Sequence, residues 1–588
     1  MKRATSQHLI PLIKDKAVDT YDLYPSHPLK NGKIEIGYDS LAQEISKDPI
    51  IILEGYAGVD WNEVVSSLTE ELQALGKTVH SMNIQDCMKP EAEILKLVEP
   101  YLGGDDPIFG FKTKLQLKDW FDESQLQQLK TKENTNVNLI YGSGASLSSL
   151  EGRLLYFDLP KNELQYRMRA GEITNLGLSR PKAAKQAYKH FYFVDWVVLN
   201  QAKKELLPHI DIIVDQQRPA QPSWTSGKAL RASLDYISST HFRVRPWFEP
   251  GVWGGQWIKE KIKGLNSEVP NYAWSFEMIV PENGLLLEDE GKLLEVSFDM
   301  LMFHQRNHVL GKAAARFKDE FPIRFDFLDT FDGGNLSVQC HPKPDYIKKH
   351  FGENFTQDET YYILDAEENA DVYLGFQEGI ESTEFKAALE HSYQTKEELN
   401  VEKYVQKLPA KKHDLFLIPH GTIHCSGKDN LVLEISATPY IYTFKMYDWQ
   451  RLDLDGNPRP LNIERAFENL NFEHQGEKVQ QNLISKPSVV EDGSDWKKIH
   501  LPTHSDHFYD IYRYEFDSEM EIETQGQCHL LMLVEGEGVR LEVENANPAA
   551  YQYAETFAIP AAAKRYTLRN LGDQTAKVVV SFVKEEAC

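Results

Sequence analysis

The hydrophobic pattern of residues 1–220 consists of short apolar runs separated by amphipathic stretches. Runs at 49–53 and 138–141 are each followed by a glycine, and residues 63–76 between them have an amphipathic pattern. Short apolar runs that alternate with amphipathic stretches are typical of a mostly parallel β-sheet covered by helices. We therefore predict an N-terminal α/β domain over residues 1–220.

The pattern changes in the second part of the chain. From about residue 240, short alternating strands are separated by turns rich in Gly, Asn and Asp, and helices are expected near 305–320, 383–407 and 462–470. The polar, proline-containing segment 216–227 precedes this change and predicts a linker, placed at 221–240. The chain is therefore predicted to be multidomain, with a mainly-β region after the α/β domain.

Candidate metal ligands lie on strands and turns of the mainly-β region. An apolar strand over 414–418 ends in a Pro-x-Gly turn that leads to His424, and the alternating segment 336–342 places Gln339 and His341 on one strand face. Glu359 precedes the apolar run 361–364. A lone histidine on a hairpin is usually structural, but two His, one Glu and one Gln suit zinc or another first-row divalent ion.

Several motifs together resemble the type I phosphomannose (mannose-6-phosphate) isomerase family, whose zinc lies in a cupin. The resemblance runs from about Phe242 to the C-terminus, and its motifs are Val252-Trp253-Gly254-Gly255, 321–329, 336–342, 359–365, the turn ending at His424, and Tyr447-Asp448 near Arg451. It implies a double cupin (jelly roll), with a metal-binding cupin and helical insertion at 241–485 and a second cupin at 486–588. It also implies that Gln339, His341, Glu359 and His424 bind one zinc ion.

The resemblance implies an aldose–ketose isomerase that interconverts mannose 6-phosphate and fructose 6-phosphate, or a closely related sugar phosphate, through a cis-enediol. This reaction needs a Lewis acid, a base and a cationic phosphate pocket. Glu434 aligns with a family active-site glutamate and is the first candidate for proton transfer, with the orientation of a metal ligand as an equal alternative. Lys445 is the second catalytic candidate, and Lys445 and Arg451 are candidate phosphate contacts, with positions at the rim as the alternative.

Three departures from the family pattern leave the proposed ligands intact. Asp326 replaces a lysine, Tyr272-Ala273 replaces Gly-Glu before Trp274, and Lys445 stands near the place of an arginine. Lysine keeps the charge of arginine but lacks its planar fork. A carboxylate at position 326 is expected to alter which sugar is accepted.

The second cupin is expected to be metal-free. Within it, Arg565 stands where the metal-binding histidine would be. Arginine keeps its proton near neutral pH and cannot replace an imidazole ligand.

The N-terminal domain resembles uridine-kinase-type P-loop domains in segments 50–62, 192–200 and 210–215. A phosphate-binding loop needs Gly-Lys-Ser/Thr, which is absent, and Asp60 places negative charge where phosphates would bind. We therefore predict a degenerate kinase-like fold with no nucleotide-binding residues and, as the alternative role, scaffolding or regulation. Arg167, Arg169 and Arg180 are interpreted as solvated surface arginines rather than remnants of an anion site.

Composition limits the partners and the compartment. The 89 acidic and 64 basic residues give a formal charge of −25 without a basic block, which argues against nucleic-acid and membrane partners. No apolar run approaches the ~20 residues of a spanning helix, the first residues lead into no signal peptide, and the five cysteines form no Cys-x-x-Cys. We expect a cytoplasmic protein with reduced thiols and a small-molecule sugar phosphate as its partner, and the oligomeric state stays open.

Two other functions compete with the isomerase. A non-catalytic sugar-phosphate-binding or regulatory protein is favoured by the degenerate loop and by Asp326. A bifunctional kinase–isomerase would need an ATP site that the sequence does not show. The complete four-ligand set favours the isomerase.

Overall fold

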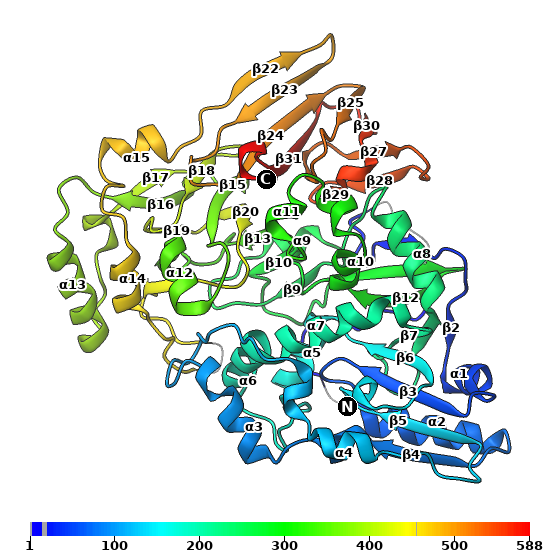
Figure 1. Cartoon of the computed structure of the whole chain (residues 1–588). Coiled ribbons are helices and arrows are strands. Elements are labelled where there is room, and N and C mark those ends of the chain that lie inside the picture. Colours follow the sequence, from blue (N-terminus) through cyan, green and yellow to red (C-terminus); the bar gives the residue numbers. More distant parts are fainter. Residues whose placement is uncertain (1–2, 15–19, 454–455) are drawn as a thin grey trace.

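The N-terminal part of the computed structural model, which describes residues 3–14, 20–453 and 456–588, is built on a seven-stranded sheet of order β2-β8-β7-β6-β3-β5-β4 (Figure 1). Strands β3 to β7 are parallel, whereas β8 pairs antiparallel with β7 and with β2. The strands are β2 (Glu35–Ile36), β3 (Ile50–Gly55), β4 (Val79–Asn83), β5 (Val137–Tyr141), β6 (Arg153–Asp158), β7 (Ile212–Asp215) and β8 (Ser223–Ser226). The predicted mostly parallel sheet is thus confirmed.

Helices cover this sheet. They are α1 (Tyr38–Ile45), α2 (Trp61–Ala74), α3 (Glu91–Val98), α4 (Glu123–Gln128), α5 (Lys161–Arg169), α6 (Ala184–His190), α7 (Trp196–Leu206) and α8 (Gly227–Ile237). The amphipathic pattern of 63–76 corresponds to α2, which buries Val64, Leu68 and Leu72 on one face. In Figure 1, α5, α6 and α7 lie on the side of the sheet that faces the rest of the chain.

The linker predicted at 221–240 is instead part of the folded N-terminal unit. Its first residues form β8, and α8 begins where the Ser226 hydroxyl accepts a hydrogen bond from the Ala229 amide. Leu230, Leu234 and Ile237 follow at helical spacing and are buried. The prediction was wrong because the prolines and polar residues of 216–222 end before this apolar face begins.

Arg167 is buried, so its interpretation as a solvated surface arginine was wrong. Its guanidinium donates to the carbonyls of Gly58 and Gln216, each at 2.8 Å. Asp60 caps α2 by accepting a hydrogen bond from the Glu63 amide. The N-terminus of α2 and the loop before it therefore contact the chain's own polar groups.

The candidate metal ligands lie in a sandwich of two antiparallel sheets, hereafter the first sandwich. One sheet has six strands in the order β18-β15-β20-β13-β10-β9, and the other has five in the order β17-β16-β19-β14-β21. The first sheet contains β9 (Trp247–Glu249), β10 (Trp274–Met278), β13 (Arg324–Asp329), β15 (Asp358–Ala366), β18 (Leu415–Ile418) and β20 (Asn430–Ala437). The second contains β14 (Val338–Cys340), β16 (Asp371–Phe376), β17 (Val405–Pro409), β19 (His424–Ser426) and β21 (Phe444–Tyr447).

Helices are inserted between these strands and after them. They are α9 (Trp257–Lys261), α10 (Asp299–Leu310), α11 (Ala314–Phe317), α12 (Pro344–Phe351), α13 (Ser382–Thr395), α14 (Ile463–Asn469) and α15 (Glu477–Asn482). The helix predicted for 383–407 ends at Thr395, and the following segment includes the edge strand β17. Val405 and Leu408 are buried there, so strand pairing with β16 replaces the helix.

The C-terminal residues form a second sandwich with its own apolar core. Its six-stranded sheet contains β22 (Ser488–Asp492), β23 (Trp496–Leu501), β24 (Tyr509–Phe516), β31 (Ala576–Val583), β26 (His529–Glu535) and β29 (Thr556–Ile559). Its four-stranded sheet contains β25 (Glu519–Glu523), β30 (Arg565–Asn570), β27 (Gly538–Val543) and β28 (Ala549–Gln552). Arg565 is exposed and lies near Glu521 and Glu523.

The N-terminal unit and the first sandwich share one apolar core. The rings of Tyr192 and Tyr440 stack across the boundary with centroids 3.9 Å apart. The fully buried Lys203 donates to Asp158 at 2.8 Å and to Ser297 at 2.6 Å. A third sheet, β1 (Ser26–Pro28), β11 (Gly284–Asp289) and β12 (Lys292–Ser297), also joins the two parts. Among the described residues, no helix has the length and apolar character that a membrane span requires.

Candidate metal centre and its cavity

Both sheets of the first sandwich contribute to the candidate metal centre. Gln339 on β14 and His424 on β19 are paired directly across neighbouring strands, and His341 follows the end of β14. Glu359 comes from β15 of the opposite sheet. The alternation of strand side chains directs these groups into the space between the sheets.

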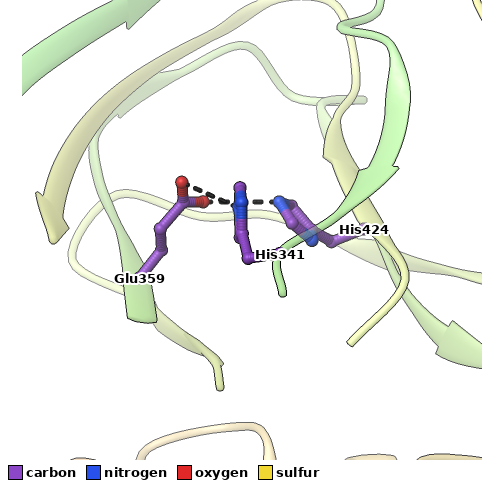
Figure 2. Close-up of side chains that lie close together, drawn as sticks. All are labelled: His341, Glu359 and His424. Carbon is purple, nitrogen blue, oxygen red and sulfur yellow. Dashed lines mark ion pairs between the residues drawn. The ribbon is translucent and has the colours of Figure 1, made fainter. Parts of the chain in front are cut away.

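Three of the four predicted ligands converge closely. His341 Nε2 lies 2.9 Å from Glu359 Oε1, and His424 Nε2 lies 3.3 Å from Glu359 Oε2. Figure 2 shows the three side chains pointing toward one another, and one ligand atom from each lies within 4.8 Å of the others. Gln339 is adjacent, because its amide nitrogen is 3.4 Å from His424 Nε2.

Backbone carbonyls orient both imidazoles. Nδ1 of His341 lies 2.9 Å from the Tyr442 carbonyl, and Nδ1 of His424 lies 2.9 Å from the Thr422 carbonyl. When Nδ1 donates to such a carbonyl, the lone pair of Nε2 is available to a metal. The pattern expected of metal-binding histidines is therefore present at both positions.

The residues fit a divalent cation. His341 Nε2 and Glu359 Oε2 are buried and make no hydrogen bond with acceptable geometry, despite their short contacts. Such buried polar atoms are costly unless a partner such as a metal ion satisfies them. Burial opposes ionisation of Glu359, but His341 and His424 lower the pKa of this carboxyl overall. Two imidazoles, a carboxylate and an amide oxygen suit zinc or another first-row ion.

A cavity of about 710 Å³ opens beside these ligands. Gln339 and Glu359 line it, as do Glu434 and Asp326, which are paired across β20 and β13. Burial raises the pKa of Glu434, and Asp326 raises it further. The pKa of Asp326 is also raised, first by burial and then by Glu359. Burial and mutual repulsion thus both favour the protonated forms of these two neighbouring carboxyl groups.

Cationic side chains line the same cavity. Lys445 on β21 is paired with Gln339 across the strands, and its ammonium has no ion-pair partner among the described residues. Burial, with Arg459 nearby, lowers the pKa of Lys445 to about 8. An unpaired lysine in a cavity of this kind is suited to an anionic group such as a phosphate.

Arg451 was predicted to contact the phosphate. Among the residues that the structure describes, Arg459 lines the cavity and Arg451 does not. Arg451 donates to Asp448 at 2.6 Å, and Arg459 contacts the other oxygen of Asp448 at 2.5 Å. The sequence analysis missed Arg459 because it lies in a proline-containing loop without a strand pattern. Its position depends on Asp448, which the chain brings close only after folding.

Two of the three departures from the family pattern reach the cavity. Asp326 and Lys445 line it, whereas Tyr272 and Ala273 are buried and directly precede Trp274, which lines the cavity. Arg324, which the sequence analysis also missed, lines the cavity two residues before Asp326 on the same strand face, and its Nε is buried without a hydrogen-bond partner. Arg324 therefore restores positive charge close to Asp326.

A family model described as "Domain of unknown function (DUF8485)" matches residues 37–239. Mannose-6-phosphate isomerase ManA from Bacillus subtilis is 24% identical over 320 residues, which cover 52% of this chain and 88% of that protein. A mannose-6-phosphate isomerase from Streptococcus mutans is 25% identical over 299 residues, which cover 49% of this chain and 82% of that protein.

A crystal structure of the mannose 6-phosphate isomerase from Bacillus subtilis matches 58% of this chain and 99% of its own, with 20% identity and a TM-score of 0.46. About half of the chain is thus similar to isomerases in sequence, and these relatives support the predicted isomerase enzyme. The model that matches residues 37–239 assigns them no function.

Proposed function

We propose that the chain is a metal-dependent aldose–ketose isomerase that interconverts mannose 6-phosphate and fructose 6-phosphate, or a closely related sugar phosphate, through a cis-enediol. The observation that carries this proposal is the convergence of His341, Glu359 and His424 beside a cavity that also contains Glu434 and Lys445. Zinc is the proposed ion, held by these three residues and Gln339. When bound, it supplies Lewis-acid polarisation of the substrate's carbonyl and hydroxyl oxygens.

The chain's own residues have distinct roles in this proposal. Glu434 takes the proton from one sugar carbon and returns it to the neighbouring carbon, which is the work of a general acid–base residue. Asp326 lies beside Glu434 and holds its proton affinity high. Lys445 and Arg459 bind the phosphate, and Arg324 offsets the carboxylate of Asp326. These cations support substrate binding despite the departures from the family pattern.

A coupled assay of mannose 6-phosphate turnover tests the proposal. The protein loaded with zinc is expected to form fructose 6-phosphate, and a chelator is expected to abolish this activity until zinc is restored. A preparation with stoichiometric zinc and no turnover of any hexose phosphate would favour the sugar-phosphate-binding alternative instead.

Lys445→Ala is expected to raise KM for mannose 6-phosphate by about 10- to 100-fold, because a charged contact to the phosphate is worth about 1.5–3 kcal/mol. Lys445→Arg should retain part of the affinity. Lys428→Ala is the matched control, since Lys428 has a side chain that is 67% exposed and lies outside the cavity wall. Equal effects of Lys445→Ala and Lys428→Ala on KM would contradict the role of Lys445 as a phosphate contact.

The N-terminal unit is proposed to be a degenerate kinase-like domain without phosphoryl transfer. Asp60 at the start of α2 and the contact of Arg167 with Gly58 support the loss of a phosphate site. Calorimetry with Mg-ATP is therefore expected to show no binding. Binding in the micromolar range would instead support the bifunctional kinase–isomerase, which no observation favours at present. We further propose a cytoplasmic location, in keeping with the five free cysteines.

A further inference from the structure

The cavity beside the metal centre belongs to both parts of the molecule. Gln165 and Arg169 from α5 and Tyr188 from α6 line it together with Glu359 and Glu434 of the first sandwich. Figure 1 shows α5 close to β9, the edge strand of the six-stranded sheet. The N-terminal unit therefore forms part of the wall that a bound sugar phosphate would meet.

This wall is fixed by direct contacts. The Gln165 amide donates to Glu282 at 2.7 Å, and the Tyr188 hydroxyl donates to the other oxygen of Glu282 at 3.0 Å. Arg169 Nη1 lies 3.0 Å from both carboxylate oxygens of Glu249 on β9. These contacts across the boundary hold the polar groups in place before a ligand binds, which lowers the entropic cost of binding.

The cavity is long in one direction. Trp247, Phe276, Asp326 and Glu434 are paired successively across β9, β10, β13 and β20, and all four line the cavity. Glu359 lies on the next strand, β15, so four inter-strand steps separate β15 from β9. At about 4.8 Å a step, this row measures about 19 Å along the sheet. The cavity therefore extends well beyond the length of a single hexose phosphate bound at the metal.

The far end of the cavity has the chemistry of a sugar-binding site. The rings of Trp274 and Phe276 are nearly parallel, with 12° between their planes, and both are partly exposed. Partly exposed aromatic rings that line a cavity can pack against the apolar face of a sugar ring. Arg169, Glu249 and Gln165 supply planar donors and acceptors for its hydroxyl groups. The carboxylate of Glu249 offsets the charge of Arg169, so a neutral polyol suits this end better than a second phosphate does.

We infer that Arg169 and Gln165 of the N-terminal unit, with Glu249 and the Trp274–Phe276 surface, form a subsite for a second sugar ring. This inference rests on the proposed function, because it places the reacting sugar at the metal. The substrate class is then a phosphorylated sugar whose carbonyl end is free and whose remote end carries another sugar unit. The N-terminal unit thereby determines specificity for the isomerase site.

Binding of β-1,4-linked mannobiose and of mannose to the zinc-loaded, full-length protein tests this inference. In a saturation-transfer NMR titration, mannobiose is expected to bind at least about tenfold more tightly than mannose. Arg169→Ala should reduce this ratio to near one, and Arg169→Lys should restore part of it. Arg180→Ala is the control, because Arg180 is an exposed arginine of the same unit.

The outcomes separate this inference from the proposed function. A wild-type ratio near one, an absence of mannobiose binding, or a ratio unchanged in Arg169→Ala would overturn the second-ring subsite. Turnover of mannose 6-phosphate is measured on the same preparations. Turnover without a preference for mannobiose would overturn the subsite alone, whereas a preference without turnover would overturn the isomerase and leave the sugar subsite standing.

Discussion

His424→Ala is expected to lose both stoichiometric zinc and isomerase turnover. His424 supplies one of the two imidazoles of the proposed centre, and the orientation of its ring by the Thr422 carbonyl has no substitute in alanine. Lewis-acid stabilisation of the transition state is worth several kcal/mol. The expected loss of kcat/KM is therefore at least about 10³-fold. Metal analysis and the coupled assay on the same purified protein measure both losses.

An exposed histidine serves as the control for this variant. His391 on α13 has a side chain that is 64% exposed, so His391→Ala should keep both zinc and turnover. The fold of His424→Ala is checked by its thermal unfolding and by circular dichroism. Retention of one tightly bound zinc ion by a folded His424→Ala protein would show that the ligand set is wrong.

Local pattern was sufficient to predict the strands that carry the candidate ligands. Gln339 lies on a strand whose alternation is visible in the sequence, and His424 follows the turn that ends the 414–418 strand. The structure pairs these two residues directly. The turn before His424 requires Gly421, whose φ of +78° is unfavourable for other residues. Motifs with such strict conformational demands are readable without the fold, which is why three of the predicted ligands meet as expected.

Contacts between distant segments could not be predicted in the same way. Arg169 is exposed, in keeping with its interpretation as a solvated surface arginine, but the structure also pairs it with Glu249. The two residues are 80 positions apart, and no periodic pattern connects them. The same holds for Arg459, which reaches the cavity through Asp448. The sequence around such a residue does not predict its contacts, because the contacting groups come from a distant part of the chain.

The composition of one segment also misled the domain prediction. Prolines and polar residues at 216–222 were given more weight than the apolar spacing of Leu230, Leu234 and Ile237. In the structure, these three side chains are buried in the core shared by the N-terminal unit and the first sandwich. The two parts are thus joined by packing rather than by a flexible linker, which keeps α5 in place over the cavity.

Glu434→Gln is expected to lower kcat by about 10²- to 10⁴-fold while zinc remains bound, because the amide keeps the shape of the side chain but cannot transfer a proton. Glu434 lines the cavity and is paired with Asp326 across the strands. If Glu434 only orients a metal ligand, the same variant should instead weaken zinc binding by about 10- to 100-fold. Metal affinity, measured by competition with a chelator, separates these two roles.

Asp326→Asn is the informative comparison for Glu434→Gln. Asp326 raises the pKa of Glu434, so replacing its ionisable carboxyl with an amide is expected to lower the pKa of Glu434. The rise of kcat with pH should then occur at lower pH, while most of the maximal kcat remains. If Asp326 itself transferred the proton, Asp326→Asn would instead lower kcat strongly at every pH. If Asp326→Asn loses turnover by more than 10²-fold and Glu434→Gln does not, proton transfer belongs to Asp326. The departure from the family pattern at this position would then define the chemistry of the site as well as its substrate.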